Sequence, residues 1–220
     1  MSYQHQWYQG PRIDLPLGKV VCIGRNYAEH ARELNNPIPE QPILFIKPAT
    51  CVVPLEQPLQ LPQRWGPVHY ETELAILVGQ PLSAATPIEA VEAIVGIGLA
   101  LDLTLREMQS ELKAKGHPWE RAKSFDGACP LSPFLPPDQL GPLGALEFTL
   151  EINGEVRQRG HSDQMLTAIP QLLAHASESF TLMPGDVVLT GTPAGVGVLQ
   201  QGDQLALELQ TLGQFLTRVT

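Results

Sequence analysis

Three of the acidic side chains of this 220-residue chain lie in two short apolar stretches, where carboxylates are unexpected. His69, Glu71 and Glu73 alternate along an apolar segment typical of a β-strand, so we expect them on one strand face. Asp102 interrupts the apolar run 96–103, where an unpaired carboxylate would be costly to bury. Glutamates so spaced also occur on solvated faces, and an aspartate ending a strand can point to solvent. Together, however, the three carboxylates predict a site for a hard cation, Mg²⁺ or Mn²⁺.

A second set of residues could move protons. His30 and Glu33 are three residues apart in a predicted helix over 26–34, capped by Asn26, and therefore share one helix face. A carboxylate beside an imidazole orients the ring and raises its basicity, which is typical of a general base, although such pairs also form on surfaces. Lys123, in a polar loop, is either a solvated lysine or, next to a metal, a group that stabilises an oxyanion.

The segment 190–197 is rich in glycine and follows a predicted strand. It lacks the Gly-Lys-Ser/Thr ending of a P-loop and the Gly-x-Gly-x-x-Gly spacing of a dinucleotide site. Its amides and threonine hydroxyls could hold a carboxylate, and the alternative is a plain tight turn.

Composition limits the possible partners. Hydrophobic residues make up 43% of the chain, enough for a buried core, while the formal net charge of −9 argues against nucleic acid and anionic membrane surfaces. The three cysteines have no disulfide or metal-site spacing and are expected to be buried thiols. We find no signal peptide and no apolar run of membrane-spanning length, so the sequence predicts a soluble, cytoplasmic protein.

The elements that must position these residues are short and mostly strands. Many prolines and glycines spread along the chain favour a predominantly β, α+β fold with a few short helices. Asn153-Gly154 predicts a tight hairpin, and Pro170 is expected to kink or split a helix. The predicted strands are 19–23, 43–46, 68–78, 96–103, 146–152, 156–160, 187–190, 204–209 and 214–219, and the predicted helices are 26–34, 86–95, 104–115 and 163–178.

Six stretches, in this order, resemble the fumarylacetoacetate hydrolase family: 21–30, 44–48, 69–73, 100–106, 122–126 and 189–193. The resemblance is to its short single-domain members, the acylpyruvate hydrolases and the oxaloacetate decarboxylases or tautomerases. It covers nearly the whole chain and suggests an N-terminal extension over 1–18 and a catalytic domain over 19–220.

The resemblance implies a fold and a set of roles. The fold would be a mixed β-roll, usually in a homodimer, with Mg²⁺ or Mn²⁺ held by Glu71, Glu73 and Asp102. The helix that carries His30 and Glu33 would order as a lid over the substrate. Lys123 matches the family's catalytic lysine, and four residues fall at or beside substrate-contacting positions: Arg25, Arg106, Gln109 and Thr192.

The main functional expectation is metal-dependent hydrolysis of a carbon–carbon bond in a 3-acylpyruvate, such as acetylpyruvate or fumarylpyruvate. Release of a pyruvate enolate would be assisted by the metal and the lysine. Decarboxylation or keto–enol tautomerisation of oxaloacetate, or a 2-hydroxyhepta-2,4-diene-1,7-dioate isomerase activity, could use the same site. An interpretation of another class is a non-catalytic scaffold with this fold.

Overall fold

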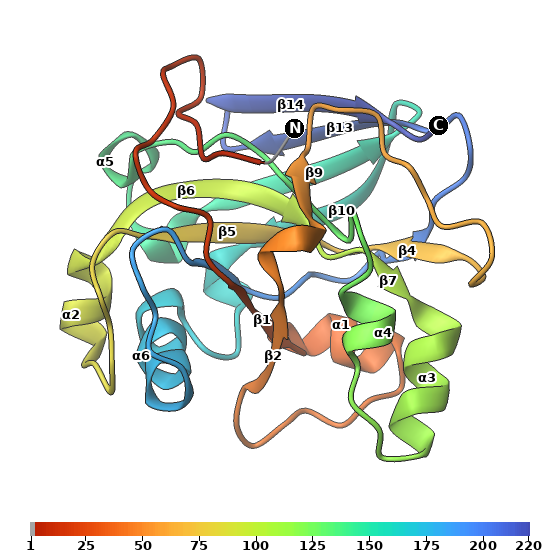
Figure 1. Ribbon diagram of the computed structural model, residues 1–220, viewed down its shortest axis with the longest axis horizontal. Coiled ribbons are helices and arrows are strands. Elements are labelled where there is room, and N and C mark those ends of the chain that lie inside the picture. The colour runs from red at the N-terminus through yellow and green to blue at the C-terminus, as the bar shows by residue number, and fades with distance from the viewer. Residues whose placement is uncertain (1–2) are drawn as a thin grey trace.

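Three β-sheets and six short α-helices make up residues 3–220, the part of the chain that the computed structural model describes (Figure 1). In the largest sheet, β1 pairs with β11 and β3 with β8 in parallel, and the other neighbours are antiparallel. This mixed pairing confirms the predicted α+β class. In spatial order the strands are β2 (Ile43–Lys47), β1 (Val20–Gly24), β11 (Val187–Leu189), β5 (Thr72–Val78), β6 (Ile94–Leu101), β8 (Cys129–Leu131) and β3 (Val52–Pro54).

A second, antiparallel sheet of four strands packs against the first, with β9 contacting β5 and β13 contacting β6 (Figure 1). Its order is β10 (Glu155–His161), β9 (Glu147–Ile152), β13 (Gln204–Leu209) and β14 (Gly213–Arg218). Asn153 and Gly154 join β9 to β10 with φ angles of 55° and 80°, the left-handed region that a tight hairpin turn requires. The predicted hairpin is confirmed.

The strand predicted over 68–78 is divided in the structure. β4 (Val68–Tyr70) lies in a third sheet between β12 (Gly197–Val198) and β7 (Thr104–Leu105), whereas β5 belongs to the seven-stranded sheet. The prediction of one continuous strand is therefore wrong. Glu71 is the residue at which the chain passes from one sheet to the other, and it is paired with a neighbouring strand in neither sheet.

The helices are short, and none within residues 3–220 is longer than 11 residues. α2 and α6 pack together, as do α3 and α4, and Figure 1 shows α1, α3 and α4 gathered on one side of β4 and β7. Pro170 lies in the first turn of α6, where its missing N–H costs nothing, so the helix predicted over 163–178 begins later than expected. The helices are α1 (Ala28–Glu33), α2 (Pro87–Glu92), α3 (Arg106–Ala114), α4 (Glu120–Lys123), α5 (Pro137–Leu140) and α6 (Ile169–Ser179).

The segment that precedes β1 is held to the domain by backbone and side-chain contacts. Tyr8 N donates to Phe134 O at 2.8 Å, and Phe134 N donates to Gln6 O at 2.8 Å. The buried His5 ring places Nε2 2.9 Å from Gly185 O. Within residues 3–220, no helix is both long enough and apolar enough to cross a membrane.

Cys22, Cys51 and Cys129 are buried and unpaired, as expected from the sequence. Burial raises the pKa of Cys51 to about 11 and raises the pKa of Cys22 and Cys129 well above the usual range. All three thiols therefore stay protonated near neutral pH.

The four-stranded sheet buries apolar side chains on one face, so substitutions on that face should lower the free energy of unfolding most. Leu207 on β13 is fully buried, whereas Leu216 on β14 is 61% exposed. Leu207→Ala should lower the free energy of unfolding by about 2–5 kcal/mol because it leaves a cavity between the sheets. Leu216→Ala should change it by no more than about 0.5 kcal/mol. Urea titration of both variants measures the difference, and equal losses would contradict the packing described here.

Candidate active site

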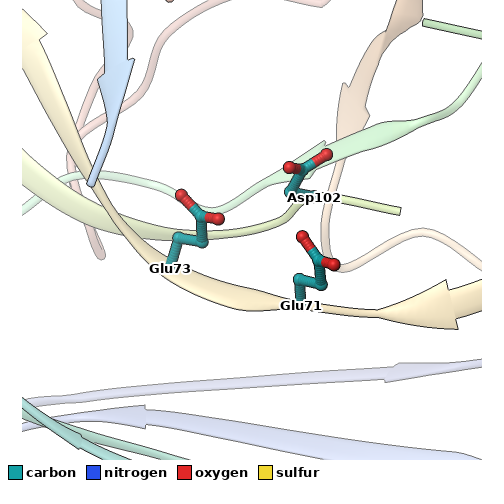
Figure 2. Close-up of side chains that lie close together, drawn as sticks. All are labelled: Glu71, Glu73 and Asp102. Carbon is teal, nitrogen blue, oxygen red and sulfur yellow. The ribbon is translucent and has the colours of Figure 1, made fainter. Parts of the chain in front are cut away.

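Three carboxylates from two neighbouring segments converge in the interior (Figure 2). Glu71 precedes β5, Glu73 lies on β5, and Asp102 follows the last residue of β6. One oxygen of each lies within 4.8 Å of the others, and all three side chains are buried. Figure 2 shows the carboxylates pointing into the same space. Three oxygen ligands in this arrangement fit a divalent cation.

Strand pairing brings these segments together. β5 and β6 are antiparallel, with Glu73 opposite Ala100 and Thr72 opposite Leu101. The Asp102 N–H then donates to the Glu71 carbonyl oxygen at 2.8 Å, just beyond the ladder. Glu71 and Asp102 both lie just outside this strand pair. Their side chains therefore need not follow the alternation of a regular strand and can turn toward Glu73.

Two cations balance part of the negative charge. Lys123 Nζ donates to Glu71 Oε2 at 2.8 Å and to Asp102 Oδ2 at 2.7 Å. Arg106 forms an ion pair with Glu71 and also donates to Gln109 Oε1 at 2.8 Å. Burial alone would raise the pKa of Glu71, but the charges of Lys123 and Arg106 outweigh burial and hold that pKa well below its usual range.

Glu73 is in a different position. No lysine or arginine of the described chain forms an ion pair with it, and its Oε2 accepts a hydrogen bond from the Gly191 N–H at 2.6 Å. Burial, followed by the negative charges of Asp102 and Glu71, raises the pKa of Glu73 well above its usual range. A bound cation would offset this repulsion. The donor set and this uncompensated carboxylate therefore both fit a metal ion.

Lys47, at the end of β2, is a site residue that the sequence analysis did not select. Its side chain is fully buried, and Nζ lies 2.9 Å from Asp102 Oδ1 as an ion pair without hydrogen-bond geometry. The ammonium group instead donates to three backbone carbonyls, those of Leu103, Lys123 and Ala128. Lys47 thus holds together the segments that carry Asp102 and Lys123.

His30 and Glu33 form the pair expected from their spacing. His30 Nδ1 lies 3.3 Å from Glu33 Oε2, and Glu33 Oε1 accepts from the Gly195 N–H at 3.0 Å. Burial lowers the pKa of His30 despite the nearby carboxylates, so the ring is neutral near pH 7. The carboxylate then selects the tautomer with hydrogen on Nδ1, which leaves Nε2 as the basic atom.

The start of the helix that carries His30 and Glu33 differs from the expectation. α1 begins at Ala28, and Tyr27 is its N-cap without a side-chain hydrogen bond, so the predicted capping by Asn26 is wrong. Asn26 instead donates to the carbonyls of Thr167 and Thr190 at 3.0 and 2.9 Å and accepts from the Thr167 N–H at 2.8 Å. The asparagine therefore anchors the beginning of α1 to the end of β11.

A cavity of about 220 Å³ brings the selected residues together. All of them except Glu33, which contacts His30, line it: Arg25, His30, Glu71, Glu73, Asp102, Arg106, Gln109, Lys123 and Thr192. The sequence thus identified most of the polar lining. It did not select the lining residues Asn36, Ser110 and Lys113. It also missed two residues that support the site from outside the lining: Lys47, although a lysine directly after the apolar stretch 43–46 was a visible signal, and Gln158, which contacts Thr192 from β10.

Two further cations face the cavity without a carboxylate partner in the described chain. Arg25 Nη1 donates to Pro37 O at 3.3 Å, and Lys113 Nζ donates to Asn36 Oδ1 at 3.0 Å. Arg25 also has a φ of 64°, a strained conformation for a residue other than glycine. These two positive charges are therefore available to an anionic ligand in an otherwise acidic protein.

Comparisons with known proteins agree with the fold. The model of the fumarylacetoacetate (FAA) hydrolase C-terminal family matches residues 19–220. Oxaloacetate tautomerase YcgM of Escherichia coli (strain K12) is 50% identical over 206 residues, covering 93% of this chain and 94% of the relative. The human mitochondrial oxaloacetate tautomerase FAHD1 is 39% identical over 186 residues, 84% of each chain.

Among solved structures, fumarylpyruvate hydrolase from Pseudomonas aeruginosa, in complex with Mn²⁺ and pyruvate, is similar with a TM-score of 0.93. The two are 35% identical, and the similarity covers 100% of this chain and 96% of that one. The family match over nearly the whole sequence, the identity to curated relatives and this structural agreement lead to one conclusion. The chain belongs to the fumarylacetoacetate hydrolase family.

Proposed function

We propose that this protein is a divalent-metal-dependent tautomerase that interconverts the keto and enol forms of oxaloacetate. The observation that carries the proposal is the single cavity that contains the carboxylate cluster, the basic Nε2 of His30 and the unpaired cations Arg25 and Lys113. The likeness to oxaloacetate tautomerase YcgM supports the choice of reaction.

Glu71, Glu73 and Asp102 would hold the ion, with Mg²⁺ as the proposed metal and Mn²⁺ as the alternative. When bound, such an ion supplies Lewis acidity that polarises the 2-oxo group of an oxo acid. Arg25 and Lys113 are the cations left to bind a substrate carboxylate, since Arg106 and Lys123 are already paired with acidic side chains.

The chain's own groups then account for proton transfer. His30 Nε2 removes a proton from C3 of oxaloacetate, and the electron pair of that C–H bond forms the C2–C3 double bond while negative charge moves to the 2-oxo oxygen. Lys123 uses two of its three hydrogens on Glu71 and Asp102, so the third can donate to this oxygen. Return of a proton to the oxygen completes the enol.

Acylpyruvate hydrolysis, the main expectation from the sequence, becomes the second candidate. The paired His30 and Glu33 could also activate water, and the similar fumarylpyruvate hydrolase structure favours this reaction. The two curated relatives described above favour the tautomerase. Decarboxylation of oxaloacetate is a further alternative, because loss of CO₂ leaves the enolate of pyruvate, which acylpyruvate cleavage would also release.

One panel of assays separates these reactions. Enol absorbance should report accelerated keto–enol exchange of oxaloacetate, while a coupled pyruvate assay measures decarboxylation and product analysis measures acetylpyruvate cleavage. We expect kcat/KM for keto–enol exchange to exceed kcat/KM for decarboxylation and for acetylpyruvate cleavage. Efficient acetylpyruvate cleavage with oxaloacetate exchange at the uncatalysed rate would overturn the proposal in favour of hydrolysis.

His30→Ala should lower kcat for exchange by about 100-fold or more, because it removes the proposed base. His175 on α6 provides a matched control, because its Nδ1 lies 3.5 Å from Oε2 of Glu178, which is also three residues away. His175→Ala should leave kcat unchanged. Steady-state kinetics of both variants check the role, and equal activity of wild type and His30→Ala would exclude it.

Chelation tests the metal site independently. EDTA should abolish the exchange reaction, and added Mg²⁺ or Mn²⁺ should restore it. Glu73→Gln should weaken Mn²⁺ binding by about tenfold or more because it removes one anionic ligand, whereas Glu92→Gln on the exposed face of α2 should not. Calorimetric titration with Mn²⁺ measures both affinities, and full activity in EDTA would exclude a metal-dependent reaction.

Arg25 should distinguish substrates by charge. Arg25→Ala should raise KM for oxaloacetate, which carries two carboxylates, by about tenfold, since it removes a charge-assisted hydrogen bond. KM for acetylpyruvate, which carries one carboxylate, should rise less. Arg64→Ala is a suitable control because Arg64 stacks on Trp65 outside the cavity. Equal increases for both substrates would mean that Arg25 does not bind the second carboxylate.

A further inference from the structure

We propose that Gln158, on β10 of the four-stranded sheet, is a positioning residue that fixes the turn 190–195 against the acidic segment 71–73. This inference rests on the proposed metal-dependent function and deepens it. Gln158 does not line the cavity, and only 1% of it is exposed. It would therefore act on the site through the residues that it contacts.

The side chain of Gln158 makes three hydrogen bonds, all of them to two segments of the site. Its Oε1 accepts from the Thr72 N–H at 2.9 Å, between the two proposed metal-binding glutamates. Its Nε2 donates to Thr192 Oγ1 at 2.8 Å and to Pro193 O at 3.0 Å. The amide orientation is fixed, because only an oxygen can accept from the Thr72 N–H.

Thr192 completes this arrangement. Its hydroxyl donates to the Thr72 carbonyl oxygen at 2.9 Å while it accepts from Gln158. The single hydroxyl hydrogen is therefore used within the protein and is not available for a substrate carboxylate. The proposed substrate contact of Thr192 is better understood as a structural link between the turn and the backbone of Thr72.

The turn connects Gln158 to both halves of the proposed mechanism. At one end, the Gly191 N–H donates to Glu73 Oε2 at 2.6 Å, and at the other, the Gly195 N–H donates to Glu33 Oε1 at 3.0 Å. Gly195 has a φ of 97°, and a Cβ there would lie 2.1 Å from the Arg157 carbonyl oxygen. β10 thus contacts the turn at its middle and near its end.

A β-bulge makes this contact possible. Val156 lies opposite Glu151, but Gln158 lies opposite Leu150, so Arg157 is an extra residue in β10. In a regular strand, Val156 and Gln158 would share a face. The extra residue turns Gln158 inward, where it is buried beside Leu150, while Val156 remains 48% exposed. The register shift therefore serves to aim this amide at the site.

Gln158→Leu tests the proposal because it keeps an apolar side chain of similar length and removes all three hydrogen bonds. In the cation-free protein, hydrogen exchange at the Gly191 and Gly195 amides should accelerate by about tenfold or more relative to the Ile76 amide in the core. The Kd for Mn²⁺, measured by calorimetric titration without substrate, should rise by a similar factor. Gln204→Leu, at an exposed glutamine on β13, should change neither quantity.

A second pair of variants covers the case in which Gln158→Leu does not fold. Thr192→Val removes the hydroxyl link and should accelerate the same exchange, whereas Thr192→Ser keeps the hydroxyl and should resemble wild type. Unchanged exchange at both glycines in a folded Gln158→Leu or Thr192→Val variant would overturn the proposal, as would a loss of global stability alone. Absence of Mn²⁺ binding to wild type would instead refute the metal-dependent function, and the exchange experiment would still decide the role of Gln158.

Discussion

The site depends on the confinement of three acidic side chains within one buried space. Glu71, Glu73 and Asp102 would repel one another strongly without compensation, and the chain compensates unequally. Lys123 bridges Glu71 and Asp102, while within residues 3–220 the carboxylate of Glu73 accepts a hydrogen bond only from the Gly191 N–H. This asymmetry leaves the negative charge of an ionised Glu73 uncompensated, and a divalent cation at the three carboxylates would compensate it.

The fold meets this constraint by ending strands at the right place. The chain changes sheets at Glu71, and β6 ends at the residue before Asp102. Neither carboxylate therefore has to follow the side-chain alternation of a strand, while the adjacent β5–β6 pair holds both backbones in place. The turn after β11 then reaches Glu73 from one side and Glu33 from the other. The proposed metal site and the proposed base would therefore be linked through one turn.

The sequence predicted those parts that depend on local pattern or on family motifs. Asn153-Gly154 specified its hairpin because both positions require positive φ, and the motifs identified the carboxylates and His30. Local pattern could not reveal that one apolar stretch divides between two sheets at Glu71, because that depends on which strands pair. The same holds for Asn26, which bonds to distant carbonyls instead of capping a helix, and for Gln158, whose inward direction follows from a one-residue bulge.

The burial of all three cysteines has a practical consequence for labelling the helix that carries His30. Their thiols are protonated and enclosed, so these cysteines offer maleimide reagents no accessible thiol in the folded protein. A single cysteine introduced at an exposed position of α1 could therefore carry a fluorophore or spin label without first removing the native thiols. The wild-type background is in this sense already suited to spectroscopic comparison of α1 with and without substrate.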